Sequence, residues 1–203
     1  MKHLLTLLMG ALMLIGTAAS PPAGYEVGDY VSDFTLRNVD GKDVSLSSYA
    51  KAKGAIVIFT CNTCPYSKLY EDRIIALHKQ FEAKGYPVIA INPNDPGQQA
   101  GDSFEEMQKR AKDKGFTFPY LQDASGSVAR AFGASRTPHV FILNKEAKGY
   151  KVEYIGAIDN NHKDAAAADQ KYVEEAISQL MSGKKPKATT TKAIGCTIKW
   201  KEA

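Results

Sequence analysis

The spacing of hydrophobic positions changes several times along the chain, and each change predicts a different element. In residues 27–49, apolar side chains share faces on both sides of the polar run 38–42, which is typical of a β-hairpin. Residues 55–59 (AIVIF) are continuously apolar, rich in β-branched side chains and too few for a helix. We therefore expect this segment to be a strand that is buried on both of its faces.

A helical period follows this strand. Five apolar residues recur at intervals of three or four positions and predict one stripe of a helix that ends at Gly85: Tyr66, Tyr70, Ile74, Leu77 and Phe81. Further along, the pattern predicts strands at 86–91, 140–143 and 150–158, and helices at 104–111, 125–132 and 173–180. The helix at 104–111 is preceded by Ser103, which forms the capping box Ser103-x-x-Glu106.

The order of these elements predicts an α/β fold. Strands joined by helical crossovers and followed by a terminal hairpin give a mixed sheet that is covered by helices. The sequence shows no internal repeat, so we predict one domain over residues 25–183. Residues 184–203 form a linker and a C-terminal tail that carries Cys196 and Trp200.

Residues 1–19 have the pattern of a secretory signal peptide. Lys2 gives a positive start, residues 4–15 are almost entirely apolar, and residues 17–20 supply small side chains for cleavage. The alternative, an uncleaved anchor, would need a longer apolar run to cross a bilayer. We predict cleavage after Ala19 and export to the periplasm or the extracellular space, with a soluble mature chain and no stable membrane insertion.

Composition and charge narrow the classes of partner. A hydrophobic fraction of 44% is typical of a globular protein, and the formal net charge is +4. Much of the basic excess lies in the tail, beside Pro186 and the threonines at 189–191. Nucleic-acid surfaces interleave basic and aromatic residues on a folded face, whereas this composition is typical of a solvated linker. We therefore expect no nucleic acid partner.

Two of the three cysteines are placed for redox chemistry. Cys61 follows the predicted strand 55–59 where the helix begins, and Cys64 lies three positions later, in the first turn of that helix. Unpaired amides and the dipole at a helix N-terminus lower the pKa of a thiol, and the thiolate is the nucleophile. The spacing lets one sulfur resolve a mixed disulfide at the other. A bystander disulfide is the alternative, because export permits one.

Metal binding has weaker support in the sequence. A zinc site needs two further ligands beside the cysteine pair, but Cys196 stands alone and the four histidines do not cluster. The polar residues of the loop that begins at position 92 match no EF-hand spacing and are typical of turns: Asn92, Asn94, Asp95 and Asp102. We expect neither a metal nor another bound cofactor.

The arrangement of these motifs resembles the thioredoxin superfamily. It combines Cys61-Asn-Thr-Cys64-Pro65 at a strand–helix junction with Thr137-Pro138 before a terminal hairpin. The long N-terminal hairpin is similar to that of the peroxiredoxin-like branch, the alkyl hydroperoxide reductase/thiol-specific antioxidant subfamily. Four segments carry this second resemblance, which runs from about Val27 to Trp200: residues 59–66, 90–95, 118–123 and 194–200.

The resemblance implies a thioredoxin-like fold, with an N-terminal β-hairpin extension and a C-terminal tail, and it implies roles for particular residues. Cys61 is then the nucleophile and Cys64 the resolving cysteine. Pro138 is a cis proline beside them, and the backbone of Thr137 pairs with a bound peptide strand. Arg136 occupies the place of an arginine that steadies the thiolate and peroxide in peroxiredoxins, although a plain surface arginine is the favoured alternative.

Two departures from the family pattern bear on activity. Peroxiredoxins carry a threonine three positions before the reactive cysteine, whereas this chain has Ile58 before Cys61 and Cys61 before Cys64. This departure favours disulfide exchange over peroxide reduction. Thioredoxin also keeps a buried acid below its cysteine pair, but the strand at 55–59 has none, and we expect Glu71 and Asp72 to face solvent.

Cys196 has two interpretations. It is either a third redox cysteine that resolves a sulfenate, or a small buried residue in a docked tail that Trp200 anchors. The strong tendency of free cysteine to be buried favours the second interpretation.

We therefore expect an exported thiol–disulfide oxidoreductase that uses Cys61 and Cys64 on protein or small-molecule disulfides. The sequence contains no flavin or nicotinamide motif, so an external thiol is the expected electron donor. One alternative is a thiol peroxidase that reduces hydroperoxides through Cys61. A second alternative is a copper-binding assembly protein, because His139 lies beside Pro138 as in copper-assembly relatives of the fold, although those have a longer cysteine spacing.

Overall fold

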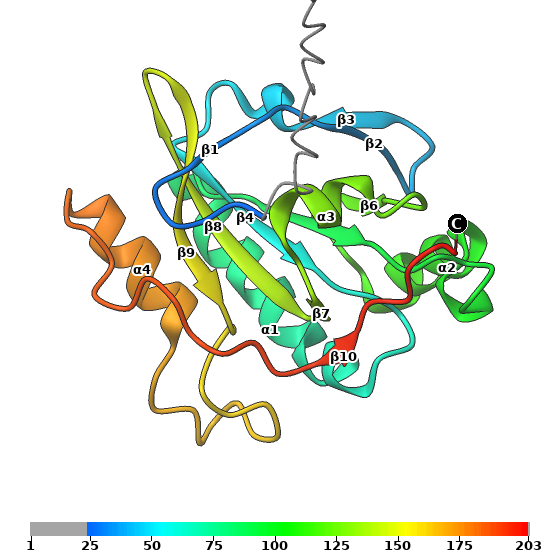
Figure 1. Ribbon diagram of the computed structural model, residues 1–203. Helices are drawn as coiled ribbons and strands as arrows, with labels where there is room; N and C mark the ends of the chain where they lie inside the picture. The colour runs from blue at the N-terminus through cyan, green and yellow to red at the C-terminus, as the bar shows by residue number, and fades with distance from the viewer. Residues whose placement is uncertain (1–23, 203) are drawn as a thin grey trace, which may run out of the picture.

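The apolar run at 55–59 lies at the centre of a mixed sheet in the computed structural model, which describes residues 24–202. Eight strands are ordered β1-β9-β8-β4-β5-β6-β2-β3 (Figure 1). Their bounds are β1 (Tyr30–Val31), β2 (Thr35–Asn38), β3 (Asp43–Ser45), β4 (Gly54–Phe59), β5 (Val88–Asn92), β6 (Tyr120–Gln122), β8 (His139–Glu146) and β9 (Gly149–Gly156). Strand β4 runs parallel to β5 and antiparallel to β8, and all of its residues are buried.

Helices cover both faces of this sheet. The four α-helices are α1 (Pro65–Phe81), α2 (Phe104–Lys114), α3 (Ser127–Phe132) and α4 (Tyr172–Met181). Short 3-10 helices span Leu46–Tyr49, Glu82–Lys84 and Ala100–Asp102. A separate two-stranded sheet pairs β7 (Arg136–Thr137) with β10 (Cys196–Thr197). The predicted thioredoxin-like fold, with a mixed central sheet between helices, is confirmed.

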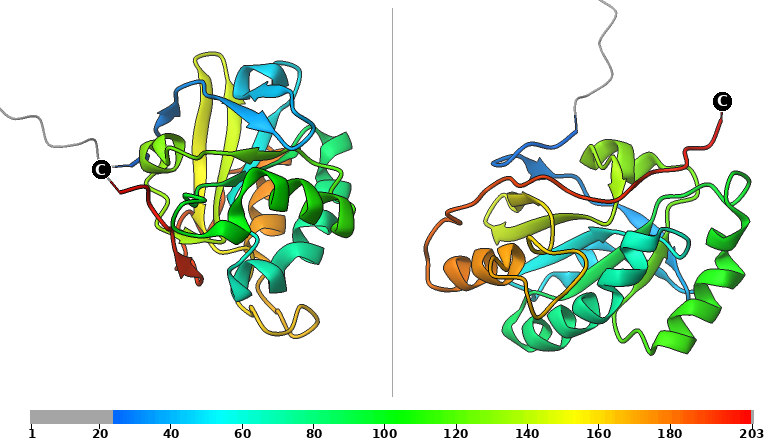
Figure 2. Two further views of the ribbon diagram at one scale, coloured as in Figure 1. Left: turned by 90° about the vertical axis from the view of Figure 1, so that its right-hand side faces the viewer. Right: turned by 90° about the horizontal axis from the view of Figure 1, so that it is seen from below.

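Alternation along the strands divides the interior into two cores. Ile56 and Ile58 of β4 face a core built with α1, α2 and α4, whereas Val57 and Phe59 face a core built with α3. The N-terminal segment, the β2–β3 hairpin and the tail pack on the same side as α3. Figure 2 shows these layers with the sheet between them.

Strand β6 was missed by the sequence analysis, and it joins the N-terminal hairpin to the rest of the sheet. Its residues pair with β5 on one side and with β2 on the other. The segment has only three residues and follows Pro119, so it shows too few positions for a period to emerge. The predicted hairpin at 27–49 itself is confirmed as β2 and β3, although Leu46–Tyr49 is a 3-10 helix.

The signals that predicted helix ends match the structure closely. The hydroxyl of Ser103 accepts a hydrogen bond from the backbone N–H of Glu106 and so caps α2. Gly133 follows α3 with a φ of 72°, which a residue with a Cβ adopts only with strain.

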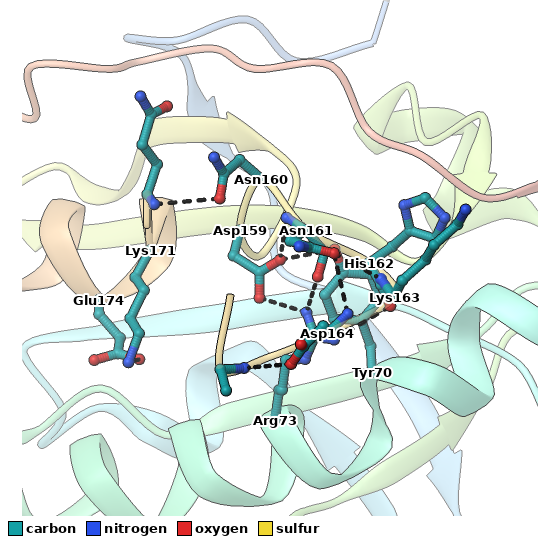
Figure 3. A network of polar contacts seen from close by, with 12 residues as sticks. Tyr70, Arg73, Asp159, Asn160, Asn161, His162, Lys163, Asp164, Lys171 and Glu174 are labelled. Carbon is teal, nitrogen blue, oxygen red and sulfur yellow. Dashed lines mark hydrogen bonds and ion pairs between the residues drawn. The ribbon is translucent and has the colours of Figure 1, made fainter. Parts of the chain in front are cut away.

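The loop between β9 and α4 is tied to α1 by a polar network (Figure 3). Arg73 on α1 forms an ion pair with Asp159, 2.6 Å between Nη1 and Oδ2. The same guanidinium donates to the backbone oxygens of Asn161 and His162. These contacts fix a loop that has little regular structure of its own.

The segment expected to be a solvated linker is partly held by backbone hydrogen bonds. The N–H of Ile155 in β9 donates to the Thr189 oxygen, and the N–H of Thr191 donates to the Ile155 oxygen. These bonds use main-chain groups only, so composition does not reveal them.

None of the helices within residues 24–202 is both long enough and apolar enough to cross a membrane. The predicted signal peptide at 1–19 and its cleavage position lie outside the described residues.

Candidate active site

The two vicinal cysteines lie where β4 gives way to α1, but their placement differs from the expected one. Cys64 is the N-cap of α1, with extended backbone, and Pro65 occupies the first helical turn, where its missing N–H costs nothing. Cys61 lies in the connection before the helix. The expectation that Cys61 would mark the helix start and Cys64 the first turn is therefore wrong by three residues.

Thr137 contacts both sulfurs. The Cys61 Sγ lies 3.2 Å from the Thr137 hydroxyl, and the Cys64 Sγ lies 3.2 Å from the Thr137 carbonyl oxygen. The peptide bond between Thr137 and Pro138 is cis, as the resemblance implied. Cys61 and Cys64 are each only 3% exposed. The structure thus gathers Cys61, Cys64, Thr137 and Pro138 into one buried cluster.

The electrostatics distinguish the two thiols. A hydrogen bond from the Cys61 side chain is the largest effect on Cys64 and lowers its pKa, against the opposing effect of burial. The N–H of Cys196 also donates to the Cys64 Sγ, at 3.4 Å. The hydrogen bond between the Cys61 and Cys64 side chains, together with burial and the negative charge of Asp102, raises the pKa of Cys61. The helix N-terminus independently favours an anion at Cys64, so Cys64 is the one of the two thiols whose pKa is lowered.

Asp102 organises the connection that carries the cysteines. It is fully buried and accepts hydrogen bonds from the backbone N–H of Asn62, at 2.6 Å, and from the hydroxyl of Thr63, at 2.7 Å. The side-chain amides of Asn92 and Asn94 donate to the same carboxylate. The polar loop that the sequence analysis assigned to ordinary turns is therefore the support of the active-site connection.

Glu71 is buried, which corrects the expectation that it faces solvent. Its carboxylate is 4% exposed and forms a bidentate pair with Arg110, with both N–O distances at 2.7 Å. Lys114 adds a third contact from α2. Glu71 and Cys61 line the same small cavity. Asp72 is exposed as expected.

Two further residues at this site were missed. Tyr120 is buried, burial raises its pKa, and its protonated hydroxyl donates to the side-chain oxygen of Asn62. Ser67 is fully buried, and its hydroxyl lies 3.9 Å from the Cys61 Sγ. The spacing Cys64-x-x-Ser67 at a helix start was the available signal for Ser67.

Arg136 and His139 do not contact the cysteines. Arg136 is exposed, and its guanidinium donates to the Gly195 carbonyl oxygen of the tail. The His139 ring packs on Phe141, and burial lowers its pKa to about 4, so the imidazole is neutral at pH 7. Within residues 24–202, no three His, Cys, Asp or Glu side chains are grouped to hold a metal ion. The copper interpretation therefore gains no support from this part of the chain.

Cys196 lies at the active site, which differs from the favoured expectation of a buried packing residue. It is partly exposed and is opposite Thr137 in the β10–β7 pairing. Its side chain is also one of the causes that lower the pKa of Cys64. Ile198 of the tail is buried, and Trp200 packs over Arg130, 4.5 Å from the guanidinium carbon to the ring centre.

Comparisons with known proteins agree with this geometry. The chain is similar to thiol-disulfide oxidoreductase ResA of Geobacillus thermodenitrificans, 26% identical over 62% of this chain and 68% of that protein. A structure of an uncharacterized conserved protein from Geobacillus kaustophilus is 32% identical over 88% of this chain and 94% of its own, with a TM-score of 0.79. A hypothetical protein from Sinorhizobium meliloti 1021 is 28% identical over 89% and 97%, with a TM-score of 0.81.

The similarity to ResA and the paired cysteines support an oxidoreductase, and the two solved structures share this chain's thioredoxin-like fold. The AhpC/TSA family matches residues 27–154, which is more than half of the chain. The protein therefore belongs to the AhpC/TSA family.

Proposed function

We propose that the protein is an exported thiol–disulfide oxidoreductase in which Cys64 is the attacking thiolate and Cys61 is its resolving partner. The observation that carries this proposal is the position of Cys64 at the N-cap of α1, where it accepts hydrogen bonds from the Cys61 thiol and the Cys196 amide. This order of roles is the reverse of the one that the resemblance implied. Export rests on the sequence pattern at 1–19.

The reaction proceeds by two exchanges. The Cys64 thiolate attacks one sulfur of a substrate disulfide, which forms a mixed disulfide and releases the first substrate thiolate. Cys61 then gives up its proton and attacks the Cys64 sulfur, which releases the second substrate thiolate. The products are a dithiol substrate and a Cys61–Cys64 disulfide, which an external dithiol reduces.

Burial of Cys61 helps to keep this thiol protonated during the first exchange. Its raised pKa keeps it protonated while the substrate approaches, so it donates a hydrogen bond to the Cys64 thiolate and does not compete as a nucleophile. Once Cys64 is engaged in the mixed disulfide, the hydrogen bond to the Cys64 thiolate, which is the largest cause of the raised Cys61 pKa, is gone. Cys61 then ionises more readily at the moment when it is needed.

The matched variants Cys61→Ser and Cys64→Ser test the order of roles in the chain without residues 1–19. With insulin as the disulfide substrate, we expect Cys61→Ser to accumulate a mixed disulfide at Cys64, detected by mass spectrometry. Cys64→Ser is expected to form none and to lose turnover by more than about 10³-fold. A mixed disulfide at Cys61 in the Cys64→Ser variant, at wild-type rate, would restore the original assignment.

The pH dependence of alkylation gives an independent test. A thiol is alkylated as its thiolate, so the rate falls as pH drops through its pKa. Because the pKa of Cys64 is lowered, to about 4, iodoacetamide is expected to label Cys64 at a nearly constant rate between about pH 5.5 and 8. An ordinary cysteine would slow by more than 100-fold over that interval. A steep decline at Cys64 below pH 8 would remove the electrostatic support for its role.

A thiol peroxidase is the second candidate, and membership of the AhpC/TSA family favours it. In that reaction peroxide oxidises the Cys64 thiolate to a sulfenate, water leaves with the second oxygen, and the Cys61 thiol condenses with the sulfenate and releases a second water. Arg136 is engaged with the tail in this structure, which leaves the peroxide without that partner. Rapid peroxide consumption alongside slow insulin reduction would make this the main activity.

A further inference from the structure

The tail is built onto the active site by several specific contacts. Residue 195 must be glycine, because a Cβ there would lie 2.2 Å from the Thr137 carbonyl oxygen. The Lys199 N–H donates to the Asn94 side chain, and the Lys199 carbonyl accepts from the Asp95 N–H. Figures 1 and 2 show the tail (orange to red) running from α4 past β7. Cys196 is therefore held at one position in the site.

The three thiols differ in access to solvent. Cys61 and Cys64 are each 3% exposed, whereas Cys196 is partly exposed. A thiol that reduces a disulfide must reach one of its sulfurs along the S–S axis. Cys196 is the most exposed of these three cysteines, and its backbone N–H contacts the Cys64 Sγ at 3.4 Å.

We infer that Cys196 is a third catalytic thiol that takes over the disulfide from Cys61 and presents it to the external dithiol donor. This inference rests on the proposed function. The Cys196 sulfur attacks Cys64 in the Cys61–Cys64 disulfide, a Cys64–Cys196 bond forms, and Cys61 leaves and takes up the proton that Cys196 gave. No electrons enter or leave in this exchange. The disulfide now includes the sulfur of Cys196, the most exposed of these three cysteines.

The donor then completes the cycle. One thiolate of the donor attacks the Cys196 sulfur and expels the Cys64 thiolate. The second thiol of the donor attacks the resulting mixed disulfide, releases Cys196 as a thiol, and leaves with its own disulfide. The donor has lost two electrons, and the enzyme has all three thiols again.

The charges at the site favour both steps. In the reduced enzyme, a hydrogen bond to Cys64 and its negative charge contribute to a raised pKa of Cys196, after burial. Both contributions disappear once Cys64 is part of a disulfide, so Cys196 becomes a better nucleophile only in the oxidised enzyme. In the second step the leaving group is Cys64, the thiolate with the lowered pKa, which is the best leaving group of the three.

Disulfide mapping of the Cys61→Ser variant tests this inference without any measurement of activity. After mild oxidation with diamide, we expect a Cys64–Cys196 disulfide in most of the folded protein, found by non-reducing peptide mapping. Trp200 is the single tryptophan, so its fluorescence reports whether the tail stays docked. Two free thiols after oxidation, with the tail docked, would overturn the inference even if the oxidoreductase function stands.

Reduction kinetics give the second readout. The disulfide form of Cys196→Ser is expected to be reduced by dithiothreitol at least about tenfold more slowly than that of the wild type. Thr197→Ser, on the exposed side of the same strand, is the matched control and should keep the wild-type rate. Equal rates in all three proteins would exclude a relay through Cys196. Failure of the proposed function would instead appear as a reduced wild-type enzyme that leaves insulin intact.

Discussion

Asp159 and Asp102 are both buried carboxylates, and their hydrogen-bond partners differ in charge. Asp159 faces the cation of Arg73, and Tyr70 donates a hydrogen bond to its second oxygen (Figure 3). Asp102 instead receives four hydrogen bonds from neutral amides and a hydroxyl, with none from a cation. Asp159 therefore serves to fasten a loop, whereas Asp102 fastens a loop and leaves a negative field at the neighbouring thiols.

This difference bears on the pKa of Cys61, which is raised first by its hydrogen bond with Cys64 and then by burial. The charge of Asp102 is one of the causes that raise the pKa of Cys61. A basic residue in place of Asn92 or Asn94 would fasten the loop equally well but would cancel that charge. Neutral donors hold the Asp102 carboxylate and leave its negative charge in place, whereas an ion pair would cancel that charge.

The largest expected effect is on folding stability, from Asp102→Ala. Four donors lose their acceptor in a fully buried position, and each unsatisfied group carries a desolvation cost. We expect the free energy of unfolding to fall by about 3–5 kcal/mol, measured by urea denaturation. A loss below about 1 kcal/mol would show that the network is not a support of the fold.

Arg73→Met tests the other carboxylate. Removal of the guanidinium leaves Asp159 buried without a cation and releases the carbonyls of Asn161 and His162. We expect a loss of about 2–3 kcal/mol, with insulin reduction by the remaining folded protein unchanged. The double variant Arg73→Met/Asp159→Asn should recover part of that loss. Impaired disulfide exchange in folded Arg73→Met would show that the surroundings of Asp159, like those of Asp102, affect the cysteines.

The variant Asp102→Asn tests the negative charge of Asp102 separately from the role of this side chain in holding the loop. The amide keeps the size of the side chain but removes the negative field, so the pKa of Cys61 is expected to move down by about one unit. The thiolate absorbance near 240 nm, followed against pH in the Cys64→Ser/Cys196→Ser background, measures this titration. Asp159→Asn is the control and should leave it unshifted. An equal shift in both variants would point to a general loosening of the protein.

The smallest expected effect concerns the link between Asp102 and the tail. Asn94 donates to Asp102 and accepts from the Lys199 N–H, so Asn94→Ala removes one tail contact. We expect a red shift of Trp200 fluorescence and a loss of about 1 kcal/mol of stability. Gln98→Ala, at an exposed position of the same loop, is the control. Unchanged fluorescence in Asn94→Ala would show that Ile198 and Trp200 dock the tail without this bond.

Local pattern was sufficient to predict the central elements of the fold. The run at 55–59 became β4, and the stripe of Tyr70, Ile74, Leu77 and Phe81 became the buried face of α1. Both are decided by the periodicity of a single segment. The cap at Ser103 was likewise predicted from residues close together in the sequence.

Features that depend on a second segment were the ones that sequence analysis missed. Glu71 looked like an exposed helical acid, because its partners Arg110 and Lys114 arrive from α2. Cys196 looked like a packing residue, because its partner Thr137 is brought to it by backbone pairing that leaves no side-chain signature. The cysteine pair itself was evident from spacing, but the residue that starts the helix decided which sulfur is the thiolate.

The distance in sequence between Cys64 and Cys196 also has a consequence for biosynthesis. The two residues are 132 positions apart, so translation at typical rates completes Cys196 roughly 7–26 s after Cys64. During that interval the nascent chain carries the vicinal pair without its cover. A newly made molecule is thus open to foreign disulfides until its last strand arrives, and folding of the tail is the event that makes the enzyme selective.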